Sequence, residues 1–295
     1  MADLLGDQAS GLRRLFGQER VRIVTFTAAS AGVGRSVVVA NLAAALARQG
    51  KDVLIIDENA DARIAALFGC VARHDLAEVI DRKLRLGDVL MPLATGVRLL
   101  PAARAVQGLA KLGAAKRDAL LDDIAAMDRP ADVILVDASS AHPLGFSPLA
   151  LAADETVMVV APTSSAITGT YSLIKKVSMG FAHRRFRLLI NKARGIDEAE
   201  AIHANIAHVT FSRGVAQTDY AGYVPLDEHL CQAERRCQPV PTLFPDAPSA
   251  IAFRQLAGEL LHWPAPAGDT GGFEHFVQQL IHLSQRIDRC VIHTR

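Results

Sequence analysis

The chain is 295 residues long; half of its residues are hydrophobic, 5% are aromatic, and its formal net charge is +1. This length allows one large α/β domain or two small ones, and the near-neutral charge excludes a strong overall field for nucleic acid or membrane. The four cysteines have no spacing typical of a zinc site, which favours free thiols in a reducing compartment.

Neither a signal peptide nor a membrane-spanning helix is predicted. The first 20 residues lack an apolar core of signal-peptide length, and no stretch approaches the roughly 20 apolar residues that span a bilayer. We therefore expect a cytoplasmic protein, at most peripheral at the inner face of the plasma membrane.

Residues 1–20 form a head that precedes the first predicted strand. Its apolar residues recur at helical spacing, which predicts a short amphipathic helix. Within this helix, residues 7–13 read DQASGLR. Periodicity alone leaves open whether the helix docks on its own domain or on a partner.

Seven short apolar runs predict the strands of a parallel sheet. Segments of helical periodicity separate most of them, and this alternation argues for βαβ units with helices on both faces. The predicted strands are residues 21–27, 52–57, 97–102, 132–137, 155–161, 186–192 and 221–225, and the predicted helices are 35–49, 116–127, 166–181 and 196–211. The sequence therefore predicts a doubly wound, mostly parallel α/β domain over residues 21–262.

The segment AASAGVG, residues 28–34, joins the first strand to the first helix and predicts a phosphate-binding loop. The free amides and positive dipole end of a helix N-terminus attract an anion, and glycines let the backbone approach it closely. The residues expected to contact phosphate are Gly32, Val33, Gly34, Arg35 and Ser36. The alternative is a tight strand-to-helix turn that binds nothing.

Polar residues follow three later strands. Asp57 and Asp137 each end an apolar strand, and Asn191 and Lys192 end another. The carboxyl ends of parallel strands meet at one edge of the sheet, where such folds bind their ligands.

This ordered series resembles the MinD/ParA family of deviant Walker ATPases, over about residues 20–262. In that family the loop reads K-G-G-x-G-K-[ST], a D-x-D follows the second strand, an aspartate ends the Walker B strand, and an Asn-Arg or Asn-Lys pair contacts adenine. The resemblance implies a P-loop NTPase fold that takes ATP and magnesium. It places Asn191 and Lys192 beside adenine and assigns the metal to Ser36, Asp57 and Asp137.

Three positions depart from the family pattern. Ser30 stands where relatives carry a signature lysine that reaches across an ATP-bound dimer, and Arg35 stands where they carry a second lysine. Asn59 replaces the second aspartate of D-x-D, which helps to orient the attacking water in relatives. Because phosphoryl transfer depends on positioned charge, we expect very slow or absent ATP hydrolysis and assign no catalytic residue.

The head resembles the N-terminal D-Q-A-x-x-L-R motif of FlhG (FleN)-type flagellar number regulators. In that group the segment stimulates FlhF, a signal-recognition-type GTPase. The resemblance implies partner contacts by Asp7, Gln8, Ala9, Leu12 and Arg13. This activity needs no ATP hydrolysis by the chain itself.

The last segment is predicted to be a tail helix. Residues 263–272 have the composition of a linker, and residues 273–295 follow as an amphipathic helix. An apolar stripe with basic residues elsewhere fits a helix in a membrane interface, and FlhG and MinD proteins resemble it in ending with a membrane-targeting helix. The expected membrane-facing residues are Phe273, Phe276, Val277, Leu280 and Ile281. The alternative is a last helix that packs on the core.

Three functions remain in view. The head favours a regulator that activates an FlhF-type GTPase, with flagellar basal-body or transcription-regulator proteins as further partners. The alternatives are a membrane-cycling MinD/ParA-type ATPase, which would form a homodimer, and a MinD-like adaptor in another assembly. The sequence shows neither a helix-turn-helix extension nor a strong basic stripe, so we expect no specific binding of nucleic acid.

Overall fold

The computed structural model describes residues 21–126, 131–140, 146–264 and 273–292, with side chains as far as residue 286. The head, with its expected partner contacts at residues 7–13, lies outside the described residues. So does most of the predicted linker, residues 265–272.

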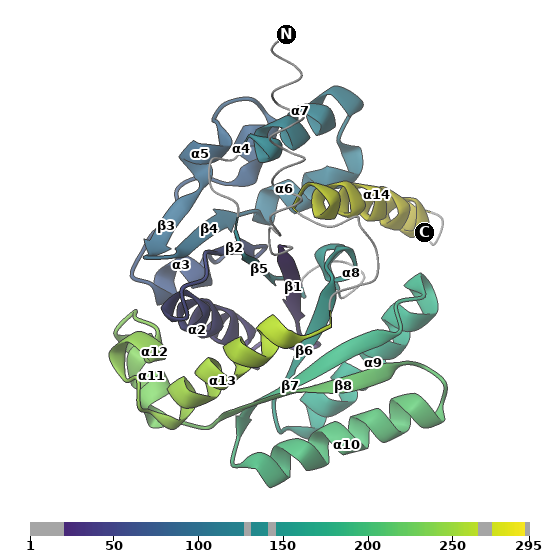
Figure 1. Ribbon diagram of the computed structural model, residues 1–295. Coiled ribbons are helices and arrows are strands. Elements are labelled where there is room, and N and C mark those ends of the chain that lie inside the picture. Colours follow the sequence, from purple (N-terminus) through teal and green to yellow (C-terminus); the bar gives the residue numbers. More distant parts are fainter. Residues whose placement is uncertain (1–20, 127–130, 141–145, 265–272, 293–295) are drawn as a thin grey trace.

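Within these described ranges, eight strands form one sheet in the order β3-β4-β2-β5-β1-β6-β7-β8. Neighbouring strands are parallel except β3, which runs antiparallel to β4 at the edge (Figure 1). The strands are β1 (Arg22–Thr27), β2 (Val53–Asp57), β3 (Met91–Ala94), β4 (Val97–Pro101), β5 (Val133–Asp137), β6 (Glu155–Val160), β7 (Arg185–Ala193) and β8 (Gln217–Pro225). The predicted fold class is confirmed.

The longer helices connect parallel strands, and several helices of four to six residues lie in the same connections. The helices are α2 (Arg35–Arg48), α3 (Arg63–Leu67), α4 (Leu76–Ile80), α5 (Leu86–Val89), α6 (Ala103–Gly108), η1 (Leu109–Lys111), α7 (Ala114–Ala125), α8 (Leu149–Ala152), α9 (Ser164–Phe181), α10 (Ile196–Ser212), α11 (Glu228–Arg235), α12 (Val240–Leu243), α13 (Pro248–His262) and α14 (Phe273–Ile292). The sequence predicted α2, α7, α9, α10 and α14 to within a few residues.

The central strands separate two hydrophobic clusters because successive strand side chains point to opposite faces. Ile55 of β2 and Leu135 of β5 belong to the cluster that contains α2 and α13. Leu54 and Ile134, one position earlier in each strand, belong to the cluster that contains α7 and α14. This double burial explains why the strands are apolar without alternation.

Helix α14 differs from the expectation for the tail. Its apolar stripe packs against η1, α7 and α8 and joins the second core cluster (Figure 1). Phe276, Val277, Leu280 and Ile281 are all buried, and the half-buried Phe273 stacks on Phe276. In this conformation the body of the protein covers these five residues, which matches the alternative of a last helix that packs on the core. Their contact with a membrane stays a prediction.

The packing beneath α14 is close. The cavity between the helix and the body measures only about 20 Å³ and has a wholly apolar lining. No helix in the described part of the chain combines the length and apolar character needed to cross a membrane.

Candidate functional site

A glycine-containing loop joins β1 to α2 at the carboxyl edge of the sheet. Gly32 and Gly34 have φ angles of 79° and 88°, in the left-handed region that favours glycine. Among the described residues, no side chain caps the N-terminus of α2. Its first amides are therefore available to an anion, as the loop sequence predicted.

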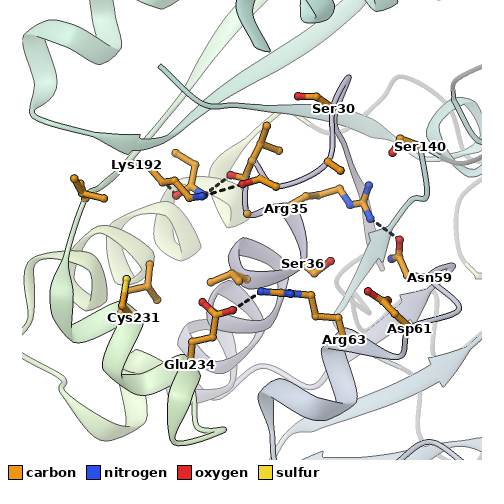
Figure 2. A pocket seen from close by; sticks show the side chains of 18 of the residues that line it. Ser30, Arg35, Ser36, Asn59, Asp61, Arg63, Ser140, Lys192, Cys231 and Glu234 are labelled. Atoms are coloured by element: carbon orange, nitrogen blue, oxygen red, sulfur yellow. Dashed lines mark hydrogen bonds and ion pairs between the residues drawn. The ribbon is translucent and has the colours of Figure 1, made fainter. Parts of the chain in front are cut away.

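The loop forms one wall of a cavity of about 500 Å³ (Figure 2). Residues 30–37 line one side. The others are lined by the segments that follow β2 and β5, the end of β7, the junction of β8 with the next helix, and α11. Sequence analysis did not assign α11 to the site. An ion pair between Arg63 and Glu234 joins α3 to α11 on this wall. The volume is that of a small-molecule site.

Two buried carboxylates lie side by side at the strand ends. Asp57 ends β2 and Asp137 ends β5, and the two residues are paired in the sheet register. Asn59 bridges them: its Nδ2 donates to Asp57 Oδ1 at 2.8 Å and to Asp137 Oδ2 at 2.9 Å. A neutral amide at this position therefore supplies hydrogen bonds that a third carboxylate could not donate.

Arg35 turns away from the phosphate loop and toward these carboxylates. Its Nε forms an ion pair with Asp137 Oδ1, and its Nη2 donates to Asn59 Oδ1 at 2.6 Å (Figure 2). The expected phosphate contact of Arg35 is therefore replaced, in this conformation, by contacts with the strand ends.

Burial dominates the electrostatics of the carboxyl groups. Desolvation, followed by the neighbouring charge of Asp137, raises the pKa of Asp57 to about 7. Desolvation also raises the pKa of Glu58 to about 7, although the Ser139 amide donates a hydrogen bond to its carboxylate. The pKa of Asp137 is raised by burial and held down in part by Arg35.

The raised pKa of Glu58 predicts a loss of stability as the pH rises. Between these two pKa values the folded state keeps a proton that the unfolded state releases. The stabilisation is therefore complete below pH 4.5, falls as the pH rises, and is lost once the pH passes about 7. At one pKa unit per 1.36 kcal/mol, Glu58 should contribute about 2 kcal/mol more at about pH 5.5 than at about pH 8. Urea unfolding at both pH values measures the change.

Glu58→Gln is the control for this prediction, because an amide mimics the protonated acid at every pH. Burial lowers the pKa of His183, which acts in the opposite direction at low pH but cancels in the comparison with the variant. Equal pH dependence in the two proteins would contradict the assigned role of Glu58.

Asn191 and Lys192 hold the phosphate loop from the end of β7. Asn191 Nδ2 donates to the Val33 carbonyl at 2.7 Å, and Lys192 Nζ donates to the Gly32 carbonyl at 2.8 Å. The structure thus brings together the two groups that sequence analysis placed in one pocket. Their expected contact with adenine stays a prediction.

The residues expected to hold magnesium converge, but their oxygens meet N–H donors. Asp137 Oδ1 contacts Arg35, its Oδ2 contacts Asn59, and Asp57 Oδ1 accepts from both the backbone N and Nδ2 of Asn59. Across the described ranges, no group of three or more His, Cys, Asp or Glu side chains is arranged to hold a metal ion. The arrangement fits phosphate at the loop and does not fit magnesium at the strand ends.

Comparison with known proteins defines the class. The family model of the CobQ/CobB/MinD/ParA nucleotide-binding domain matches residues 24–240. The solved septum site-determining protein MinD of Pyrococcus horikoshii, complexed with Mg-ADP, has the same fold, with a TM-score of 0.62 and 21% identity over 81% of this chain and 96% of that one. The chain belongs to the MinD/ParA nucleotide-binding family.

Within this family the chain is of the FleN (FlhG) type. It is 30% identical to the antiactivator FleN of Pseudomonas aeruginosa over 92% of its own length and 97% of that protein. It is also 26% identical to the flagellum site-determining protein YlxH of Helicobacter pylori, over 52% of this chain and 53% of that one.

Proposed function

We propose that this chain is a MinD-like regulator of flagellar number and placement that binds and activates an FlhF-type GTPase through residues 7–13. Similarity to FleN over nearly the whole chain, and to the flagellum site-determining YlxH over about half of it, supports the flagellar role. The name antiactivator, borne by FleN, supports a regulatory protein as one of the expected partners.

A further part of the proposal concerns ATP hydrolysis, and it rests on the engagement of Arg35 and Asn59 with the strand-end carboxylates. A nucleotide pocket whose charged groups bind one another has few left to stabilise a transition state. We therefore propose that the cavity takes an adenine nucleotide as a ligand, through the loop amides, and hydrolyses ATP slowly or not at all.

An actively cycling membrane ATPase has less support. Ser30 offers only a short neutral side chain where relatives reach across a dimer with a lysine. The apolar face of α14 is packed in the core rather than open to lipid. We accordingly propose a cytoplasmic regulator whose output is a protein contact.

The chemistry of the head suits that output. Gln8 can position a water at the partner's GTP, and Arg13 can stabilise charge that develops on the transferred phosphate. A segment that folds onto a partner groove through its apolar face supplies both groups at once.

The proposal is tested on the purified full-length chain with an FlhF-type GTPase. We expect the wild-type chain to accelerate phosphate release from GTP. Gln8→Ala and Arg13→Ala should each reduce the accelerated rate by at least about tenfold, since a positioned arginine is commonly worth about a thousandfold or more.

Arg14→Ala is the matched control, because it removes a neighbouring positive charge outside the motif. It should leave the stimulation within about twofold of the wild-type value, in contrast to the loss expected for a group acting on phosphate. If Gln8→Ala and Arg13→Ala also kept full stimulation, a MinD-like adaptor in another assembly would be the better assignment.

A further inference from the structure

The side chain of Arg35 occupies the strand-end site rather than the phosphate loop. The side chain is 11% exposed. Among the described residues it binds Asn59, which follows β2, and Asp137, which ends β5. Figure 2 shows the guanidinium extending from the start of α2 toward Asn59. A guanidinium stays protonated throughout the accessible pH range, so its positive charge at this point is permanent.

This charge balances the buried acids. Asp57, Glu58 and Asp137 are 2%, 9% and 0% exposed, and Asp137 is in direct contact with Arg35. The other cations of the cavity are committed elsewhere: Arg63 pairs with Glu234, and Lys192 donates to the Gly32 carbonyl. Arg35 is therefore the cation that serves these carboxylates.

The same contacts leave no suitable place for a divalent ion. Magnesium requires near-octahedral oxygen ligands at about 2.0–2.1 Å, whereas the inward oxygens of Asp57 and Asp137 accept N–H bonds. A guanidinium held against Asp137 also repels a second cation.

We propose that Arg35 is a built-in replacement for magnesium, so that the cavity takes the phosphates of an adenine nucleotide without a divalent cation. The inference rests on the proposed nucleotide pocket and adds how its charge is balanced. The Arg-for-Lys and Asn-for-Asp departures then belong together, because Asn59 accepts from Arg35 while donating to both carboxylates.

The first test is calorimetric titration of the full-length chain with ADP and with ATP, in excess magnesium chloride and in EDTA. We expect dissociation constants that agree within about twofold under the two conditions. Affinity at least tenfold tighter with magnesium, or about 1.4 kcal/mol, would overturn the proposal. Absence of binding in both conditions would overturn it too, while leaving the GTPase stimulation to be judged by its own assay.

The second test uses Arg35→Gln, which removes the charge while keeping part of the stem. Removing the guanidinium frees Asp137 Oδ1 and takes away the charge that repels a cation, while Asn59 keeps its bonds to Asp57 Oδ1 and Asp137 Oδ2. Nucleotide binding should therefore become at least tenfold tighter in magnesium than in EDTA. Magnesium alone should also raise the melting temperature of this variant and not that of the wild type.

Arg187→Gln is the matched control. The side chain of Arg187 is similarly enclosed, 12% exposed, and forms an ion pair with Glu155. Both residues lie near the starts of their strands, β7 and β6, at the edge of the sheet opposite the candidate site. This variant should show no magnesium response in either readout. If Arg35→Gln fails to fold, the wild-type titration still decides, and an Arg35→Gln protein that folds without gaining magnesium dependence refutes the proposal.

Discussion

Phe276→Ala should lower the free energy of unfolding by about 3–5 kcal/mol, the usual cost of truncating a fully buried phenylalanine. Phe276 is 2% exposed and belongs to the core cluster between the sheet and α14. The cavity already present there is only about 20 Å³, so the neighbouring side chains have little slack with which to fill the space. Urea unfolding of the full-length chain measures the loss.

Gln279→Ala is the control on the same helix, because Gln279 lies on the exposed face. It should change stability by less than about 0.5 kcal/mol, as surface substitutions usually do. A membrane-facing α14 predicts a different pattern, in which Phe276→Ala leaves unfolding in solution unchanged and weakens binding to lipid vesicles. That pattern would contradict the packing described here.

The sequence leaves two places open for this helix, and the reason is physical. An apolar stripe such as Phe276, Val277, Leu280 and Ile281 reports that one face avoids water, and it does not report what covers that face. A bilayer interface and a protein core select the same spacing. The deciding information lies in side chains distant in sequence, such as Ile56 and Leu149, which line the space beneath the helix.

The fold itself was predictable because its strands are both short and continuously apolar. Runs such as residues 133–137 are buried at every position, and a sheet covered on both faces requires that pattern. The edge strand β3 was not predicted, since its sequence MPLA is brief and contains a proline. Proline is tolerated there because an edge strand has one unpaired side.

The sequence predicted which residues form the site, but not how all of their side chains are directed. Parallel strands deliver Asp57, Asp137 and Asn191 to one edge, so their proximity followed from topology. The direction taken by Arg35 did not, because a side chain at a helix start can reach either the loop or the strand ends. Only the packed structure shows that Asn59 and Asp137 bind it.

The contact between the loop and β7 supports the second large prediction. Gly34→Ala should cost about 2–5 kcal/mol and abolish nucleotide binding. A Cβ at Gly34 would lie 2.4 Å from Asn191 Nδ2, far inside van der Waals contact. Asn191 is buried and donates to the Val33 carbonyl, so moving it breaks a buried hydrogen bond worth about 1–3 kcal/mol. The left-handed backbone at φ 88° adds about 1–2 kcal/mol for any residue with a Cβ.

Gly32→Ala separates these two contributions. Its φ of 79° carries the same backbone penalty, yet a Cβ there meets no atom within 4 Å among the described residues. Urea unfolding should therefore show a loss of only about 1–2 kcal/mol for Gly32→Ala. The additional loss of unfolding free energy in Gly34→Ala measures how strongly Asn191 stabilises the loop. Equal losses in the two variants would mean that β7 does not hold the loop. The amides of α2 would then depend on the glycine backbone alone for their placement toward a phosphate.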